Sequence, residues 1–388
     1  MLTERRILLL THEFPPYIGV VGRYCWSLAE AAARAGQRVT VLAPSHSDGD
    51  TEHYEKLEGV NVLRFPAELF HFRELRRFER VARDVIDQGN WDIVHAADWP
   101  MIVALRNLAV TRTQTISTLH GNDLLNIRRS LRAWMVGAPR ALARFSHYVC
   151  DSRHTASLLL RDFPRLADVD LRIAPLGVDQ FWFDTPSTLE VEAYRRRIGH
   201  VPDERIVLTV APLEERKGQL ATLAALARLP EEERRRVKYV CIGLSMDPAF
   251  EARIAAMAEA VGVTTVLTGA LRDSHLRAAY MIADVLALCG SSLPRRMSGF
   301  GPVPMEAAAQ GLPAVVTRAH ALPELVRHGS TGWICEQGDT ESIANSLRIA
   351  LSRESRSAFQ TSCIAHAREF TWDRCAETTY AARLAAAA

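Results

Sequence analysis

Two polar segments carry side chains suited to binding an anion or moving a proton, and each follows a short apolar run. Residues 118–123 read TLHGND and combine an imidazole, an amide and a carboxylate. Residues 214–218 read EERKG and place two cations just before a helix-forming stretch. A cation beside a helix N-terminus can hold a diphosphate. A single histidine after a strand is more often structural, so these patterns indicate a site without defining its reaction.

A third segment, residues 298–313, reads SGFGPVPMEAAAQGLP and predicts a glycine-rich loop that opens a short helix. Unpaired backbone amides at such a helix start can bind phosphate. Glu306 can accept hydrogen bonds from vicinal hydroxyls, as acidic residues do with ribose. The alternative is that Glu306 only stabilises the first helical turn.

Lysine scarcity draws attention to Lys217. The chain has 47 lysines and arginines together, but lysine stands only at Lys56, Lys217 and Lys238. We expect Lys217 to face bound phosphate, with a solvated surface lysine as the alternative.

Elements that position these segments alternate regularly along the chain. Nearly continuous apolar runs between helical stretches are typical of parallel, doubly wound sheets. The predicted strands are 6–11, 39–43, 60–65, 92–96, 115–119, 147–150, 205–210, 238–243, 264–268, 285–289 and 314–317. Helices are expected at 22–34, 70–87 and 219–229 and from Ser355 onward. A break near 180–203 predicts two Rossmann-like domains, with a cleft outside the carboxyl ends of their strands.

Composition excludes several classes of protein. The 388 residues are enough for two or three domains, and 48% are hydrophobic with 24% charged, as in soluble globular proteins. A net charge of +2 argues against a dedicated nucleic-acid binder. Seven scattered cysteines without a CxxC pair fit a reducing cytosol. No apolar run reaches the ~18 residues of a membrane span, and the start of the chain resembles a strand more than a signal peptide. We therefore expect a cytoplasmic protein.

Ordered landmarks along the whole chain resemble the family-four retaining glycosyltransferases of GT-B fold. They read FPPYIGVVGRY, DIVHAADWP, TLHGND, SRHTASLL, RIAPLGVD, ERKG, MIADVLALCG, GFGPVPMEAAAQGLP and ALPELVRHGSTGW. The resemblance implies an α/β protein with an acceptor domain at 1–180 and a nucleotide-sugar domain at 181–365. It also implies a last helix within 366–388 that crosses back to the first domain.

The resemblance also assigns roles to individual residues. His120, Lys217 and Glu306 would be catalytic, with Lys217 on the diphosphate, Glu306 on the ribose and His120 near the donor sugar. The donor site as a whole would be formed by Gly19, Arg216, Lys217, Gly269, Leu271, Ser298, Gly299, Phe300, Gly301, Val303 and Glu306. The acceptor site would be formed by Tyr17, Arg23, Asn122, Asp123 and Arg128.

Relatives of this kind use a nucleoside-diphosphate sugar as co-substrate, here expected to be GDP- or UDP-linked, and hold neither a metal nor a tightly bound cofactor. The implied route is front-face attack, in which the leaving diphosphate helps to deprotonate the acceptor. The expected partners are the nucleotide sugar and a small-molecule acceptor, without nucleic acid or peripheral membrane contact. A homodimer is compatible with the resemblance.

Four positions depart from the family pattern: Val20 in a Gly-Gly pair, Pro212 where an arginine is usual, Ser298 at the first glutamate of Glu-x7-Glu, and Pro302, which has no amide hydrogen. We interpret Ser298 as favouring an unusual donor sugar, and hypothesise a role in natural-product (antibiotic) biosynthesis. The alternatives are a degenerate nucleotide-binding protein without activity and a nucleotide-sugar epimerase.

Three further patterns receive simpler explanations. The Asp48–Asp50 and Asp168–Asp170 pairs mimic a metal-binding DxD motif and are interpreted as coincidence. Arginines at 73, 76, 77, 80 and 83 alternate with acids and predict a solvated helix face, with membrane docking as the weaker alternative. The cluster of Arg128, Arg129 and Arg132 is a candidate contact for an acidic acceptor.

Overall fold

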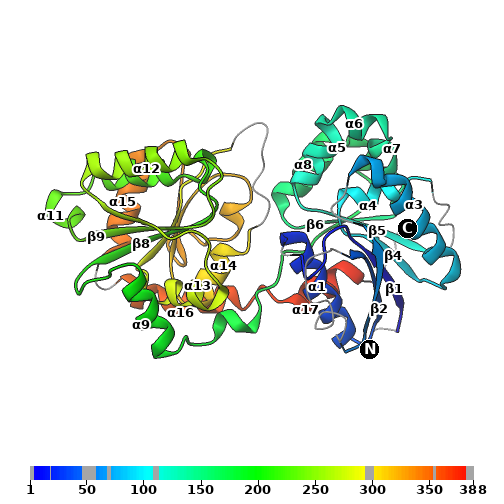
Figure 1. Ribbon diagram of the computed structural model, residues 1–388, viewed down its shortest axis with the longest axis horizontal. Coiled ribbons are helices and arrows are strands. Elements are labelled where there is room, and N and C mark those ends of the chain that lie inside the picture. Colours follow the sequence, from blue (N-terminus) through cyan, green and yellow to red (C-terminus); the bar gives the residue numbers. More distant parts are fainter. Residues whose placement is uncertain are drawn as a thin grey trace. The chain divides into compact units, whose positions relative to one another are not determined.

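A computed structural model describes residues 4–17, 19–45, 58–67, 71–107, 113–292, 301–352 and 355–381. Their backbone forms two compact units (Figure 1). The first contains the described residues up to Gly177 and those from Thr371 onward, and the second contains those from Val178 to Phe370. Ser298, Gly299, Phe300, Lys56 and the Asp48–Asp50 pair lie outside the described residues.

The first unit is built on a seven-stranded sheet in the order β3-β2-β1-β4-β5-β6-β7, in which all pairs are parallel. Its central strands are apolar and buried on both faces, as a doubly covered parallel sheet requires. The strands are β1 (Arg6–Leu10), β2 (Arg38–Ser45), β3 (Val60–Pro66), β4 (Ile93–Ala96), β5 (Gln114–Leu119), β6 (His147–Cys150) and β7 (Asp170–Ile173).

Helices cover both faces of this sheet (Figure 1). One face carries α1 (Val20–Arg34) and the last helix, α17 (Trp372–Tyr380), which pack on each other. The opposite face carries α3 (Leu75–Gln88), α4 (Trp99–Ala104), α5 (Asn122–Arg129), α6 (Leu131–Met135), α7 (Ala138–Leu142) and α8 (Arg153–Asp162). Trp372 and Tyr380 of α17 are buried in the first unit, so α17 is part of its core.

The second unit has a six-stranded parallel sheet in the order β10-β9-β8-β11-β12-β13. Its strands are β8 (Arg205–Val210), β9 (Val237–Ile242), β10 (Thr264–Leu267), β11 (Val285–Leu288), β12 (Ala314–Thr317) and β13 (Gly332–Cys335). The helices are α9 (Thr188–Arg197), α10 (Gln219–Leu226), α11 (Glu231–Arg234), α12 (Pro248–Val261), α13 (Asp273–Ile282), α14 (Val303–Ala309), α15 (Thr340–Ala350) and α16 (Ser355–Ala367). In Figure 1, α12 and α15 lie on one side of this sheet and α9, α13 and α16 on the other.

The fold confirms the predicted class: two Rossmann-like, doubly wound parallel sheets. Two strands escaped prediction, and both are edge strands. β7 reads DLRI and is only partly buried, while β13 reads GWIC and begins with a glycine, so neither shows a long apolar run. The helix expected at 70–87 is a 3₁₀ turn at Phe72–Glu74 followed by α3. All seven cysteines are buried thiols, as their apolar surroundings predict.

Candidate functional site

Each sheet has one point where the chain reverses the direction in which it adds strands. In the first unit this switch lies between β1 and β4, and in the second between β8 and β11. Ligands of open parallel sheets bind outside the carboxyl ends of the strands at such a point, because the loops there diverge. A ligand site is therefore expected at the loops beside these two points.

In the first unit, an ion pair between the partly buried His12 and the buried Asp98 joins the loops after β1 and β4. His12 Nδ1 lies 3.0 Å from Asp98 Oδ2. The same oxygen accepts hydrogen bonds from the His12 amide and from the Thr11 hydroxyl, each at 2.9 Å. The other Asp98 oxygen caps α4 by accepting from the Met101 amide at 3.1 Å. Asp98 thus fixes both loops at the switch point.

The charge state of His12 follows from this pair. Burial disfavours the imidazolium, but Asp98, with help from Glu13, outweighs burial and raises the pKa of His12 to about 9. Burial also opposes the Asp98 carboxylate, and yet His12 and the hydrogen bonds lower its pKa. His12 is therefore a cation at neutral pH, held between Asp98 and Glu13.

Gly19 leaves room for the Glu13 carboxylate at the start of α1. A Cβ on Gly19 would lie 2.0 Å from Glu13 Oε2, so no larger residue fits there without displacing the acid. Glu13 also accepts a hydrogen bond from the Gly22 amide, and burial raises its pKa. The predicted donor residue Gly19 thus lies at a helix N-terminus next to the Glu13 carboxyl group.

His120 lies in the loop after β5, and its ring contacts the loop after β4. Its Nε2 lies 3.1 Å from the Ala97 carbonyl oxygen, and its ring contacts Tyr24 edge-on at 4.7 Å between centroids. A carbonyl only accepts, so Nε2 carries the proton and Nδ1 is the acceptor in the neutral ring. The His120 amide donates to Asp123 Oδ2 at 2.7 Å. Nδ1 has no hydrogen-bond partner within the described part of the chain.

The predicted acceptor residues differ in burial and in contacts. Asp123 is buried and accepts from the amides of His120 and Trp99, so it shapes the loop. Arg128 is exposed and pairs with Asp162 at 2.8 Å, which links α5 to α8. Tyr17, Arg23 and Asn122 all lie at or beside loops on the carboxyl side of the sheet, with Arg23 and Asn122 exposed.

In the second unit, Lys217 lies at the end of a 3₁₀ turn, Glu215–Lys217, directly before Gly218 and α10. Gly218 has φ +87°, and a Cβ there would lie 2.3 Å from the Cys289 carbonyl carbon. The Ser291 amide donates to the Arg216 carbonyl at 3.0 Å. The loop after β8 is therefore fastened to the loop after β11 at the switch point.

The charge of Lys217 is disfavoured by burial and by the neighbouring Arg216. Together they lower the pKa of Lys217 to about 8, and Glu214 acts in the opposite direction. Arg216 itself pairs with Glu214 at 2.7 Å. An arriving polyanion would relieve this disfavoured charge, which is the electrostatic character expected of a diphosphate site.

Glu306 lies in the first turn of α14 and is 4% exposed. Its Oε2 accepts from the Tyr280 hydroxyl of α13 at 3.0 Å. Gly301 and Val303 lie at the start of the same helix, where Pro302 and Pro304 remove two amide donors. The loop after β10 contains Gly269 and Leu271, and the Gly269 carbonyl accepts from the Gly243 amide at 3.1 Å.

The predicted site residues that the structure describes lie in or beside loops at the carboxyl ends of strands. Three residues that contact these loops were not predicted as site residues: His12, Asp98 and Tyr280. Asp98 lies inside the DIVHAADWP motif and His12 lies two residues before FPPYIGVVGRY. Their pairing across two loops depends on the strand order β1-β4. Tyr280 lies in a helix that showed no site pattern. Asp170, half of a DxD mimic, pairs with Arg172 at 2.6 Å, which agrees with its interpretation as coincidence. In the described chain, no group of acids, histidines and cysteines has the arrangement of a metal site.

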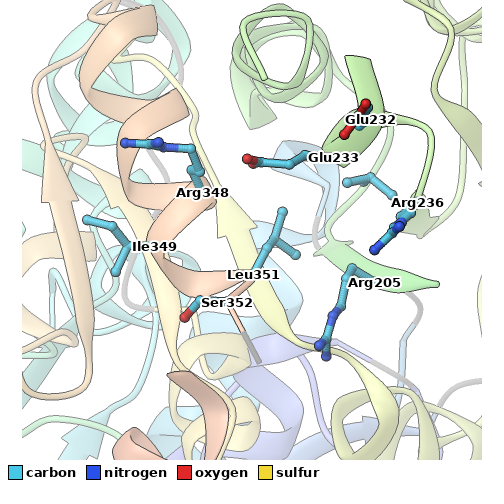
Figure 2. A pocket seen from close by; sticks show the side chains of 9 residues that line it. Arg205, Glu232, Glu233, Arg236, Arg348, Ile349, Leu351 and Ser352 are labelled. Carbon is cyan, nitrogen blue, oxygen red and sulfur yellow. The ribbon is translucent and has the colours of Figure 1, made fainter. Parts of the chain in front are cut away.

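A groove of about 490 Å³ lies elsewhere in the second unit (Figure 2). Arg205 and Val237 begin β8 and β9, so the groove is at the amino ends of the strands. Its other lining residues are Glu232, Glu233, Arg236, Arg348, Ile349, Leu351 and Ser352. None of the predicted site residues contributes to it.

Two Rossmann-like units with polar loops at both switch points form an open parallel-sheet architecture, and comparisons with known proteins identify its family. The family model described as Glycosyltransferase Family 4 matches residues 21–180, and Glycosyl transferases group 1 matches residues 190–370. This chain belongs to glycosyltransferase family four and has the GT-B fold. Within the described residues, no helix is both long and apolar enough to cross a bilayer.

Relatives and solved structures agree with this assignment. An uncharacterized glycosyltransferase of Methanocaldococcus jannaschii is 27% identical over 89% of each chain. A GDP-mannose-dependent alpha-(1-6)-phosphatidylinositol monomannoside mannosyltransferase of Mycolicibacterium smegmatis is 29% identical over 91% of each. The crystal structure of Anabaena Alr3699/HepE with UDP and glucose superposes with a TM-score of 0.73 at 19% identity, covering 96% of this chain and 98% of that one.

Proposed function

We propose that this glycosyltransferase moves a sugar from a nucleoside-diphosphate donor to a small-molecule acceptor with retention of the anomeric configuration. The observation that carries the proposal is Lys217, a partly buried cation that follows Arg216 and lies directly before Gly218 and α10. A diphosphate there would be stabilised by the lysine and by the helix amides. The mannosyltransferase relative is GDP-mannose-dependent by name, which supports a GDP-linked donor, with UDP as the other choice.

Each residue then has a defined task. Lys217 stabilises the charge that develops on the leaving diphosphate, and Glu306 holds the ribose against Tyr280. His120, with its Nε2 proton committed to Ala97, presents Nδ1 as an acceptor to a sugar hydroxyl. The leaving phosphate oxygen takes the proton of the attacking acceptor on the same face. Catalysis rests on positioning and charge stabilisation.

The identity of the sugar is the finer part of the proposal. Ser298 replaces an acid that would accept from sugar hydroxyls, so an amino, deoxy, methylated or extended sugar loses less at this position than glucose or mannose. The natural-product role follows from such a donor. Full activity with ordinary UDP-glucose or GDP-mannose on a common acceptor would remove both parts.

A second candidate function is a nucleotide-binding protein without turnover. It is favoured by Pro212, since the usual diphosphate arginine is missing and Arg216 is paired with Glu214. This candidate predicts nucleotide binding without release of nucleoside diphosphate from any donor.

One experiment separates the two. A thermal-shift panel of nucleoside diphosphates and their sugars identifies the base, because a ligand at a hundredfold excess over Kd stabilises the native state by roughly 2.7 kcal/mol. Donor hydrolysis is then followed in wild-type protein and in Lys217→Ala. We expect turnover in wild type and a loss of about a hundredfold or more in the variant. Retained turnover in the variant would refute the role of Lys217, and binding without turnover in wild type would favour the second candidate.

A further inference from the structure

A buried line of polar side chains crosses the core of the first unit on the face covered by α1 and α17. The Tyr380 hydroxyl lies 3.0 Å from His95 Nδ1, and His95 Nε2 lies 2.7 Å from Thr118 Oγ1. Thr118 Oγ1 in turn lies 3.1 Å from the Tyr24 hydroxyl. All four side chains are at most 3% exposed. A buried polar group must be hydrogen-bonded to be tolerated, so each member depends on its neighbours.

The protonation of His95 determines which hydroxyl donates and which accepts along this line. Burial, followed by the nearby His120, lowers the pKa of His95 to about 3, so the ring is neutral. A neutral imidazole donates from one nitrogen and accepts at the other. The hydroxyls of Tyr380 and Thr118 must therefore play opposite roles, and removing either one leaves a ring nitrogen buried without a partner, at a cost comparable to a lost hydrogen bond.

The line ends at the proposed catalytic histidine. Tyr24 contacts the His120 ring edge-on, with an interplanar angle of 76°. Thr118 also precedes His120 by two residues at the end of β5. On its other side Tyr24 lies 6.2 Å, between centroids, from Trp372 of α17. Two routes, one aromatic and one hydrogen-bonded, thus run from α17 to Tyr24 and from there to His120.

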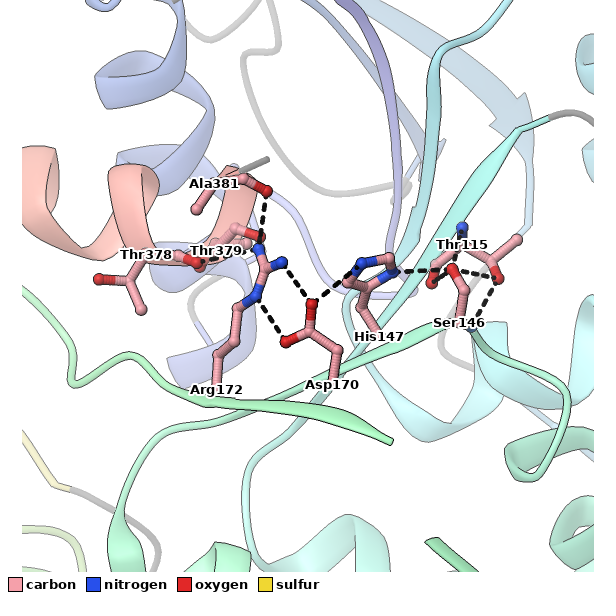
Figure 3. A network of polar contacts seen from close by, with 8 residues as sticks. All are labelled: Thr115, Ser146, His147, Asp170, Arg172, Thr378, Thr379 and Ala381. Atoms are coloured by element: carbon pink, nitrogen blue, oxygen red, sulfur yellow. Dashed lines mark hydrogen bonds and ion pairs between the residues drawn. The ribbon is translucent and has the colours of Figure 1, made fainter. Parts of the chain in front are cut away.

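The end of α17 is itself held firmly. Figure 3 shows the Arg172 guanidinium reaching the carbonyl oxygens of Thr378, Thr379 and Ala381, the last at 2.9 Å. Arg172 is fixed by both oxygens of Asp170, at 2.6 and 3.0 Å. Arg5 adds a hydrogen bond to the Tyr380 carbonyl. A cation at a helix C-terminus is favourable. Tyr380 is therefore held at its main chain by Arg5 and at its hydroxyl by His95.

We propose that Tyr24, Thr118, His95 and Tyr380 form a positioning array that fixes the ring of His120 and couples its geometry to the docking of α17. The role of His120 in turnover rests on the proposed function, whereas the coupling between the four residues and the His120 ring does not. None of the four is assigned a contact with substrate, so they act through His120.

The test uses the full chain and reads the His120 ring directly. In protein labelled with ¹⁵N-histidine, long-range nitrogen–proton spectra report the tautomer, with His120 assigned from a His120→Asn variant. We expect one Nε2–H tautomer in wild type and in Thr118→Ser, which keeps the hydroxyl. We expect mixed or exchanging His120 signals in Thr118→Val and in Tyr380→Phe. Tyr148→Phe is the matched control, because it removes a buried hydroxyl that donates to Leu142 on the other face of the same sheet.

Turnover of the donor found in the thermal-shift panel is the second readout. In Thr118→Val and Tyr380→Phe we expect kcat to fall by about tenfold to a hundredfold, with the Kd of the nucleoside diphosphate unchanged, and Tyr148→Phe to keep its kcat. Unchanged His120 signals in both array variants would overturn the array, whatever the turnover. Altered signals in a protein that turns over no donor would leave the array standing and refute the proposed function.

Discussion

At the residue scale, the charge of Lys217 decides how pH acts on donor binding. Its pKa of about 8 lies below the ordinary value of 10.5 because burial disfavours the ammonium. A bound diphosphate would raise that pKa again, so binding above pH 8 must take up a proton. The affinity for the nucleoside diphosphate should therefore fall as pH rises above about 8, with a slope that approaches tenfold per pH unit.

Calorimetric titration of wild type and of Lys217→Arg across this range provides the measurement. The arginine stays protonated, so its affinity should be nearly independent of pH. A wild-type Kd that is the same on both sides of pH 8 would contradict the assignment of Lys217 to the diphosphate.

The raised pKa of His12 makes the protein less stable as pH rises, whereas a carboxylate with a lowered pKa makes a protein less stable as pH falls. Its pKa is raised from 6.5 to about 9 by Asp98 and Glu13 against the effect of burial, so the folded state binds the proton more tightly than the unfolded state. The stabilisation is complete below pH 6.5 and is lost as pH rises through about 9. We expect this loss to be on the order of 3 kcal/mol.

Urea unfolding of wild type and His12→Asn at several pH values isolates this contribution. The difference in unfolding free energy between the two proteins should shrink steadily between about pH 6.5 and 9. A difference that stays constant over this range would mean that His12 is not protonated in the folded protein.

At the element scale, the turn between β8 and α10 depends on Gly218. Its φ of +87° is the left-handed region, and a Cβ would lie 2.3 Å from the Cys289 backbone and 2.6 Å from the Gly290 amide. Gly218→Ala should therefore cost several kcal/mol and abolish the nucleotide-induced thermal shift. Gly262 at the end of α12 has φ +67° and open space around it, so Gly262→Ala should cost only about 1 kcal/mol and retain the shift.

Elements were the level at which sequence reasoning succeeded best. Buried runs such as RIVLTV in β8 predict strands because no polar face interrupts them. The edge strand β7 failed because DLRI mixes charge with apolar residues. Asp170 of this strand pairs with His147 and with Arg172, and Arg172 binds carbonyl oxygens at the end of α17 (Figure 3). Arg172 and α17 are about 200 residues apart in sequence, so no local pattern reveals this contact.

In the candidate site too, local patterns predict where a residue lies but not its contacts with distant segments. The sequence placed Lys217 before a helix and Glu306 in a first helical turn, as the structure has them. Their roles at the diphosphate and the ribose stay predictions. The His12–Asp98 pair and the array behind His120 were not predicted, because each joins separate strands through the sheet order. For Lys238, one of the three lysines, the sequence predicted no role. In the structure it is buried and forms an ion pair with Glu204 at 2.8 Å.

At the scale of the whole molecule, each unit has its own sheet and its own hydrophobic core. A ligand that binds only the native second unit should therefore raise the stability of that unit first, by roughly 2.7 kcal/mol at a hundredfold excess over Kd. Amide hydrogen exchange of the full chain, with and without the nucleoside diphosphate, resolves the two. Slower exchange is expected at β8, α10 and α14, where the proposed diphosphate and ribose contacts lie. Exchange at β6 and β7 of the first unit, which carry no donor residue, should be unchanged and serves as the internal control. Protection that begins in the first unit and spares α10 would show that the nucleotide binds elsewhere than at Lys217.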